Sequence, residues 1–299
     1  MSILIVGSSN TDMVIKSATL PKPGETVTGG SFFLAPGGKG ANQAVTAARL
    51  GGNVIFAAKI GNDSFGQQAI AGYRNEGINI SQIIAEKEHS TGIALILVDN
   101  NGENLISVAS GANFQWSDKD IERLRPVIES ADIVVMQLEI PLTTVAAVAE
   151  IAAAANVPVL LDPAPAQKLP AELLRNVSVL KPNQNEAGIV SGIEVIDNES
   201  AVKAAEKLLT MGVRDAVVIT LGSKGALVLK RGGSPEFFAA APVQAVDSTA
   251  AGDAFTGALA FKLSRCVPLS EAVPFANRVA ALSTTKLGAQ PSLPSAADV

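Results

Sequence analysis

The chain has 299 residues, of which 47% are hydrophobic and 17% charged, and this balance predicts a well-packed globular protein rather than a disordered one. Its formal net charge of −5 excludes a general electrostatic attraction to nucleic acid. The single cysteine, Cys266, excludes an internal disulfide and fits a reducing compartment. Because no secretory start and no membrane span are recognisable, we expect a cytoplasmic protein.

Short apolar runs alternate with helical patterns along the chain. The runs suit strands buried on both faces and lie at Ile3–Val6, Val54–Ala57, Ile133–Met136, Val157–Leu161, Val177–Lys181 and Ala216–Thr220. Helices are expected at Ala41–Leu50, Phe65–Glu76, Thr143–Ala155, Glu186–Ser191 and Ala201–Met211. The alternation predicts a three-layer α/β/α fold with a mostly parallel sheet, formed by residues 1–299 as a single domain, with ligands at the carboxyl ends of the strands.

Two segments, at about 12–36 and 90–110, depart from this alternation. In the second, the apolar run Ile93–Val98 is followed by an Asn100-Asn101-Gly102 turn and then by Asn104–Val108, which predicts a β-hairpin. A small separate sheet has one face in water and one apolar face that needs a cover. A second copy of the chain would provide that cover.

The stretch Asp247–Phe255 predicts a tight turn that leads into a helix. Pro242–Val246 before it alternates like a short strand, and Phe255, Leu259 and Leu263 after it fall on one helical face. The small residues between them would leave the first N–H groups of the helix open to an anion. Asp253 then has two interpretations: an ordinary complement to the helix dipole, or a general base beside bound phosphate.

The sequence Asp-Ser-Thr-Ala-Ala-Gly-Asp-Ala-Phe in this stretch resembles the signature Asp-Thr-x-Gly/Ala-Ala-Gly-Asp-x-Phe of the ribokinase-like (PfkB) carbohydrate kinases. Pro-Gly-Gly-Lys-Gly-Ala-Asn-Gln, from Pro36 to Gln43, matches that family's second signature. The resemblance implies a β-sheet lid formed by the two irregular segments and a homodimer joined through these lids. It also implies transfer of the γ-phosphoryl group of ATP to the 5-hydroxyl of D-ribose, with Mg²⁺ and a monovalent cation, K⁺, as cofactors.

The resemblance assigns roles to residues near the strand ends. Asp253 would be the base, and the backbone of Ala250, Ala251, Gly252 and Asp253 the anion hole. The sugar would be bound by Asn10, Asp12, Gly38, Lys39, Gly40, Asn42, Glu139 and Asp253. From the residues alone, Asn10 and Asp12 could equally be turn residues, Lys39 a solvated cation and Glu139 a surface acid.

A second set would hold the nucleotide and the metals. ATP would contact Asn183, Glu186, Thr220, Gly222, Ser223, Lys224, Gly225, Gly252 and Asn277, the last standing where a histidine is common in the family. Asn183 and Glu186 would lie near Mg²⁺, mainly through water, although their spacing also matches a helix capping box. The monovalent cation would be held around Asp247, Thr249, Ser283, Lys286, Gly288 and Ser292.

Other functions remain open at this point. A kinase of the same family could act on another sugar or a nucleoside, such as deoxyribose, fructose or adenosine. The scaffold could also serve as a non-catalytic sugar-binding regulator. Asn10 favours ribose over deoxyribose, because an analogue without the hydroxyl leaves a polar group of the site unpaired.

Overall fold

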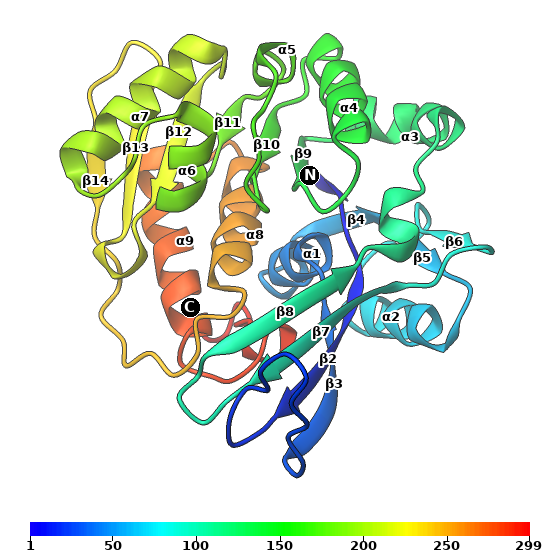
Figure 1. The fold of residues 1–299 in the computed structure, drawn as a ribbon. Coiled ribbons are helices and arrows are strands. Elements are labelled where there is room, and N and C mark those ends of the chain that lie inside the picture. The colour runs from blue at the N-terminus through cyan, green and yellow to red at the C-terminus, as the bar shows by residue number, and fades with distance from the viewer.

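The structure, a computed structural model, describes residues 1–299, and an eight-stranded sheet between two layers of helices forms its centre (Figure 1). In spatial order its strands are β14 (Glu236–Phe238), β13 (Ala226–Lys230), β12 (Ala216–Thr220), β11 (Val179–Leu180), β10 (Val159–Leu161), β9 (Ile133–Met136), β1 (Ser2–Val6) and β4 (Asn53–Ala57). The strands from β4 to β12 are parallel, and β13 and β14 add an antiparallel edge. The predicted three-layer fold with a mostly parallel sheet is confirmed.

Each face of the sheet is covered by its own layer of helices. One layer contains α3 (Asp118–Ser130), α4 (Leu142–Ala154), α5 (Ala171–Leu174), α6 (Gln184–Ser191) and α7 (Asn198–Met211), and the other contains α1 (Lys39–Arg49), α2 (Ser64–Asn75), α8 (Ala251–Leu263) and α9 (Leu269–Ser283). Successive strand residues point to opposite faces, so Leu4 packs in the first layer and Ile5 in the second. Coverage on both sides explains why continuous apolar runs mark these strands. None of the helices is long and apolar enough to cross a membrane.

One predicted element is wrong. Pro242–Val246 is not a strand, although its residues alternate between apolar and polar. It has no neighbouring strand, and Val243 and Val246 are 40% and 61% exposed. The backbone N–H groups of Val246 and Asp247 instead both donate to the carbonyl of Thr284, so the segment follows the end of α9 rather than a sheet edge.

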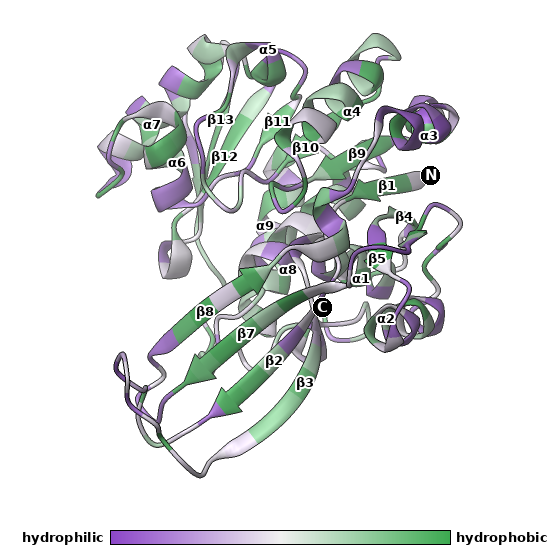
Figure 2. Ribbon diagram, turned by 45° about the vertical axis from the view of Figure 1, so that its right-hand side comes forward, coloured by the Kyte–Doolittle hydropathy of each residue, from purple (hydrophilic) through white to green (hydrophobic).

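The two irregular segments supply most of a second, four-stranded sheet, in the order β3 (Ser31–Gly37), β2 (Asn10–Lys16), β7 (Gly92–Val98) and β8 (Asn104–Ala109). The predicted hairpin is β7–β8, and Gly102 in its turn has a φ of 86°. Figure 2 shows this sheet projecting from the main body, with apolar residues along its strands. β5 (Lys59–Gly61) and β6 (Ile84–Glu86) form a separate short pair, and η1 (Gly111–Phe114), η2 (Gly222–Lys224) and η3 (Gln290–Ser292) are single turns.

Glycines allow α1 to approach both β1 and α8 very closely. A Cβ atom built on Gly40 would lie 2.5 Å from the backbone nitrogen of Ser8 and 2.7 Å from the carbonyl carbon of Gly7. On α8, a Cβ atom on Gly257 would lie 2.6 Å from the carbonyl oxygen of Gln43. The start of α1 is therefore wedged between the end of β1 and the first turns of α8, and no side chain could be added there without moving backbone.

We expect Gly40→Ala to destabilise the protein by about 1–3 kcal/mol, because the added methyl group meets backbone atoms that cannot give way. Gly72→Ala is the matched control, since Gly72 lies in α2 with open space around its α-carbon. That change should stabilise the helix by about 0.5–1 kcal/mol. Urea unfolding of both variants measures the difference, and equal stabilities would show that α1 is not tightly packed.

Candidate active site

The predicted site residues gather at the carboxyl edge of the main sheet, where β1, β9, β10 and β11 end and where α1 and α8 begin. Asn10 and Glu139 follow β1 and β9, and Asn183 follows β11. Lys39 opens α1, and Asp253 lies in the first turn of α8. This is the edge at which ligands bind in open parallel sheets.

The turn before α8 leaves backbone donors free. Ala250 has a left-handed backbone with a φ of 61° and caps the helix without a side-chain hydrogen bond. The N–H of Ala251 donates to the carbonyl of Ser248, at 3.2 Å, whereas the N–H groups of Ala250, Gly252 and Asp253 have no partner within the protein. Free donors at the positive end of a helix dipole can bind an anion, as the sequence predicted.

Asp253 is buried beside this turn, with 5% of its surface exposed, and both of its carboxylate oxygens accept hydrogen bonds. Asn42 Nδ2 donates to Oδ2 at 2.9 Å, and Gln43 Nε2 donates to Oδ1 at 3.1 Å. Burial raises the pKa of Asp253, and the positive charge of Lys39 opposes this shift. The two predicted motifs therefore meet here, because α1 supplies both amides that hold the acid of α8.

A layer of buried polar residues behind Asp253 was missed in the sequence. Gln43 Nε2 also donates to Asp162 Oδ2 at 3.0 Å, and Gln137 Nε2 donates to Gln43 Oε1 at 2.6 Å, which fixes the orientation of the Gln43 amide. Asp162 forms a fully buried ion pair with Lys181, at 3.0 Å, and its Oδ1 has no partner. Asp162 follows β10 directly, so the signal that identified Glu139, a polar residue at a buried strand's end, could have found it.

Lys39 is placed among carboxylates rather than in solvent. The charge of Asp253, followed by those of Glu139, Asp162 and Glu186, raises its pKa despite partial burial. Its backbone N–H donates to Glu139 Oε2 at 2.9 Å, and that oxygen also accepts from Ser8 Oγ at 2.6 Å. The arrangement favours a functional role for Lys39 over that of a solvated cation, and it ties Glu139 to the start of α1.

The remaining sugar-side residues line the same region. Asn10 Oδ1 accepts a hydrogen bond from Asn113 Nδ2 at 2.7 Å, which leaves the amide group of Asn10 as its free donor. Gly38 has a φ of 91°, and a Cβ atom there would lie 2.8 Å from the backbone nitrogen of Asn10. Gly38 and Gly40 thus serve close backbone packing, whatever contacts they make with a ligand.

On the nucleotide side, Asn183 and Glu186 form the capping box of α6, with reciprocal bonds of 2.9 and 2.7 Å. Burial and the negative charge of Asp162 raise the pKa of Glu186. Thr220 is the backbone neighbour of Asn183, and η2 brings Gly222, Ser223 and Lys224 next to it. Asn277 donates to the carbonyls of Phe238 and Ala239, at 3.0 and 3.2 Å, so it holds the chain after β14.

Asp247 binds two other members of the predicted cation set, Thr249 and Gly288. Asp247 Oδ2 accepts from the N–H of Gly288 at 2.8 Å, and Oδ1 accepts from the N–H and hydroxyl of Thr249. These hydrogen bonds lower the pKa of Asp247 despite its partial burial, so the group is ionised at neutral pH. No protein donor binds the backbone carbonyls of the six residues, which are Asp247, Thr249, Ser283, Lys286, Gly288 and Ser292.

A buried acid, a nearby lysine and free helix N–H groups are the kinds of group that phosphoryl transfer to a hydroxyl uses. The sequence matches the pfkB family of carbohydrate kinases over residues 1–296, and the chain belongs to that family. The membership predicted from the two motifs is thereby confirmed.

Individual relatives are similar over nearly their whole length. The ribokinase of Haemophilus influenzae is 44% identical over 293 residues, which cover 98% of this chain and 95% of the relative. A structure of Arabidopsis thaliana ribokinase complexed with ribose and ATP has a TM-score of 0.91 and 32% identity, covering 99% of this chain and 96% of that one. The deoxyribokinase of Salmonella typhimurium is 35% identical, with 99% and 96% coverage.

The pKa of Asp12 gives a prediction for pH dependence. Burial, followed by the negative charges of Glu139 and Asp253, raises this pKa to about 6. Below that pH Asp12 is protonated and loses acceptor capacity for a sugar hydroxyl, so kcat/KM for the sugar should fall as the pH decreases through 6. Glu139→Gln removes one of the negative charges that raise the pKa of Asp12, so this variant should move the inflection to lower pH.

Asp12→Asn should remove the Asp12 contribution from the pH profile altogether. Asp132→Asn, at the exposed opposite end of β9, is the control and should leave the profile unchanged. An inflection that stays in place in both Asp12→Asn and Glu139→Gln would assign the titration to another group.

Proposed function

We propose that this protein phosphorylates the 5-hydroxyl of D-ribose with ATP, forming D-ribose 5-phosphate and ADP. The observation that carries the proposal is Asp253, buried between two amides and next to the unpaired N–H groups of the α8 turn. The identity with curated ribokinases and the likeness to a ribokinase that holds ribose and ATP support ribose as the acceptor.

In the reaction, a carboxylate oxygen of Asp253 takes the proton of the sugar hydroxyl while the hydroxyl oxygen forms a bond to the γ-phosphorus of ATP. The bond between that phosphorus and the bridging oxygen of ADP breaks, and ADP leaves with the electron pair. The amides of Asn42 and Gln43 hold the carboxylate in one orientation. A raised pKa makes Asp253 a stronger base than an ordinary aspartate, and the free N–H groups stabilise charge on the transferred group.

The polar residues nearest the nucleotide side fit Mg²⁺ with water ligands. The protein has no group of three or more acidic, histidine or cysteine residues that could hold a metal by itself. The unpaired Oδ1 of Asp162 and the carboxylate of Glu186 lie close enough for the charge of one to raise the pKa of the other. Bound there with the triphosphate, Mg²⁺ would neutralise the phosphate charge, while Asp162, Glu186 and Asn183 would hold its water shell.

The backbone carbonyls of the six predicted cation residues accept no protein hydrogen bond, and neutral carbonyl oxygens together with one carboxylate are a suitable ligand set for a monovalent cation such as K⁺. We propose that K⁺ binds at this group of residues. Its chemical contribution is a fixed positive charge close to the anion-binding turn. Asp247 keeps the two chain segments together through Gly288 and Thr249.

Deoxyribose is the competing candidate for the sugar substrate, because a deoxyribokinase is 35% identical to this chain. Asn10 favours ribose, since its free amide would remain unpaired against a sugar that lacks the corresponding hydroxyl. A substrate panel with D-ribose, 2-deoxyribose, fructose and adenosine, read through ADP release, tests the choice. Higher kcat/KM for deoxyribose than for ribose would contradict it.

Asp253→Asn removes the base and should lower kcat by about 10²- to 10⁴-fold. Ribose binding, measured by calorimetry, should persist, because the other sugar-side groups are intact. Asp132→Asn makes the same chemical change at an exposed position on the opposite edge of the sheet and serves as the control. Turnover within tenfold of wild type in a folded Asp253→Asn protein would remove Asp253 from the role of base.

We further propose that the second sheet, formed from segments 12–36 and 90–110, is a lid over the sugar site and joins two copies of the chain in a cytoplasmic homodimer. Asn10 and Asp12 lie on β2, so the sheet carries part of the sugar site itself. On the face opposite to Asn10 and Asp12, its strands expose large apolar side chains, among them Phe32 at 60%, Leu95 at 54% and Leu105 at 50%. An exposed patch of this kind marks an interaction surface.

Leu105→Asp should convert the dimer to monomers, because a charge placed on this face of the sheet opposes burial of that surface. Ile196→Asp is the matched control, since Ile196 is 67% exposed in the loop before α7. Sedimentation velocity distinguishes the two states. A wild-type monomer at micromolar concentration, or equal dissociation by both variants, would contradict an interface at the sheet.

A further inference from the structure

Arg49, the last residue of α1, ties together three segments that are distant in sequence. Its Nε and Nη2 atoms donate to the two carboxylate oxygens of Glu76 beside α2, at 2.9 and 2.6 Å. Its Nη1 donates to the backbone carbonyls of Gln290 and Leu293, at 2.7 and 2.8 Å. The planar guanidinium group can make all four contacts at once, which an ammonium group cannot do.

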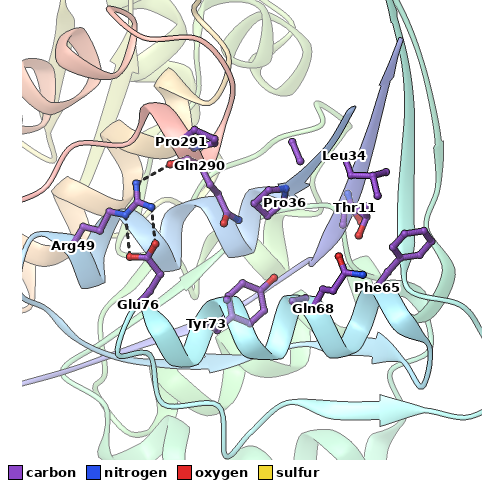
Figure 3. Close-up of a pocket in the computed structure, with 14 residues that line it drawn as sticks. Thr11, Leu34, Pro36, Arg49, Phe65, Gln68, Tyr73, Glu76, Gln290 and Pro291 are labelled. Carbon is purple, nitrogen blue, oxygen red and sulfur yellow. Dashed lines mark hydrogen bonds and ion pairs between the residues drawn. The ribbon is translucent and has the colours of Figure 1, made fainter. Parts of the chain in front are cut away.

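Figure 3 shows this contact at the edge of a cavity of about 340 Å³, which also borders Leu34 of β3 and Tyr73 of α2. Because the cavity lies against Gln290 and Pro291, side-chain packing does not hold these residues on that side. The amide nitrogen of Gln290 is buried and has no hydrogen-bond partner. Leu293 is buried, with 3% exposure, and Arg49 is the side chain that binds backbone carbonyls at both ends of the Gln290–Leu293 stretch.

The anchored segment is the one that carries proposed cation ligands. Gly288 lies two residues before Gln290, and Ser292 lies between Gln290 and Leu293, the two residues whose carbonyls Arg49 binds. The carbonyls of Gly288 and Ser292 point to no protein donor. Gly288 donates its N–H to Asp247, the first residue of the turn that leads into the anion-binding end of α8.

We propose that Arg49, oriented by Glu76, positions the Gly288–Leu293 segment for the monovalent cation and thereby sets the affinity of the protein for K⁺. Arg49 is a positioning residue: it binds carbonyls next to the ligands, and its side chain has no hydrogen bond to a proposed sugar or nucleotide residue, although Asn10 borders the same cavity. The inference rests on the proposed K⁺ site. It predicts a defect in cation affinity, whereas maximal turnover and ribose binding are retained.

The test compares wild type, Arg49→Met, Arg49→Lys and Glu76→Gln across a K⁺ titration. Choline chloride keeps the ionic strength constant, so that screening does not change. Two readouts are taken: the rate of ADP formation, and the thermal unfolding midpoint without substrates. The second readout reports cation binding independently of turnover, because a ligand that binds only the folded state stabilises it by RT ln(1 + [L]/Kd) and so raises the midpoint as its concentration exceeds Kd.

Arg49→Met should raise the K⁺ concentration for half-activation about tenfold, the expected result of losing a charged hydrogen-bonded anchor. The midpoint increase caused by K⁺ should require a similarly higher concentration. Arg49→Lys and Glu76→Gln should fall between wild type and Arg49→Met, since each keeps part of the anchor. At saturating K⁺, kcat and the KM for ribose should be within twofold of wild type.

Arg231→Met is the matched control. Arg231 also donates to three backbone carbonyls, those of Leu209, Val213 and Arg214, but it lies at the end of β13 near α7. Its loss should lower the unfolding midpoint without changing the K⁺ requirement. An equal change in K⁺ requirement in both arginine variants would show general loosening and overturn the inference.

The remaining outcomes separate the inference from the proposed site. If K⁺ neither activates nor stabilises the wild type, the K⁺ site is absent and the inference fails with it. If wild type responds to K⁺ and Arg49→Met responds at the same concentrations, the site stands and the role of Arg49 is wrong. If Arg49→Met does not fold, Arg49→Lys and Glu76→Gln decide by the same criteria.

Discussion

The structure of the site depends on one buried carboxylate and on what makes its burial possible. Removing a carboxylate from water costs free energy. For Asp253, two amide donors and the positive charge of Lys39 offset this cost. All three compensating groups belong to the first turns of α1. The burial of Asp253, the proposed base on α8, therefore depends energetically on the start of α1, although most of the chain separates the two in sequence.

This dependence explains the order of polar groups behind the acid. Gln43 has one amide nitrogen for two carboxylates, Asp253 and Asp162, and its own oxygen is occupied by Gln137. Asp162 is in turn neutralised by Lys181. Each buried charge thus has a partner of opposite sign or an amide donor, except at Asp162 Oδ1. This unpaired oxygen belongs to the same carboxylate whose negative charge raises the pKa of Glu186. A cation bound near the two carboxylates would therefore stabilise their negative charge.

Much of the fold could be predicted from the sequence, because strands covered on both faces leave continuous apolar runs. Ile3–Val6 and Ala216–Thr220 were recognisable for that reason, and α1 because its small residues follow Gly38. The Pro242–Val246 prediction failed because alternation alone cannot show whether a neighbouring strand exists. The helices α3 and α9 and the antiparallel strands β13 and β14 were not predicted, although α3 begins at a Ser117–Asp120 capping box and places Ile121, Leu124 and Ile128 on its buried face, a signal that could have identified it.

The proposed catalytic and sugar-binding residues could be identified from motifs in the sequence, but their contacts could not. Nothing in the sequence of α1 shows that Asn42 and Gln43 point at Asp253, because that contact depends on the crossing of two helices. A backbone carbonyl can bind a cation, or accept a hydrogen bond from a residue such as Arg49, whatever side chain its residue carries. The sequence therefore does not reveal these contacts. Asp162 and Lys181 lie at strand ends, where a more consistent use of the same rule would have identified them.

The close approach of Gly257 to the carbonyl of Gln43 has a consequence for motion during turnover. Two helices whose backbones touch cannot slide or separate by a fraction of a turn without losing the hydrogen bonds of the acid between them. The projecting strands, of which β8 is exposed along its whole length, are then the part of the structure that can move as the sugar enters and its phosphate leaves. We infer that substitutions in those strands would alter the release step, whereas the spacing between base and anion-binding turn stays constant through the cycle.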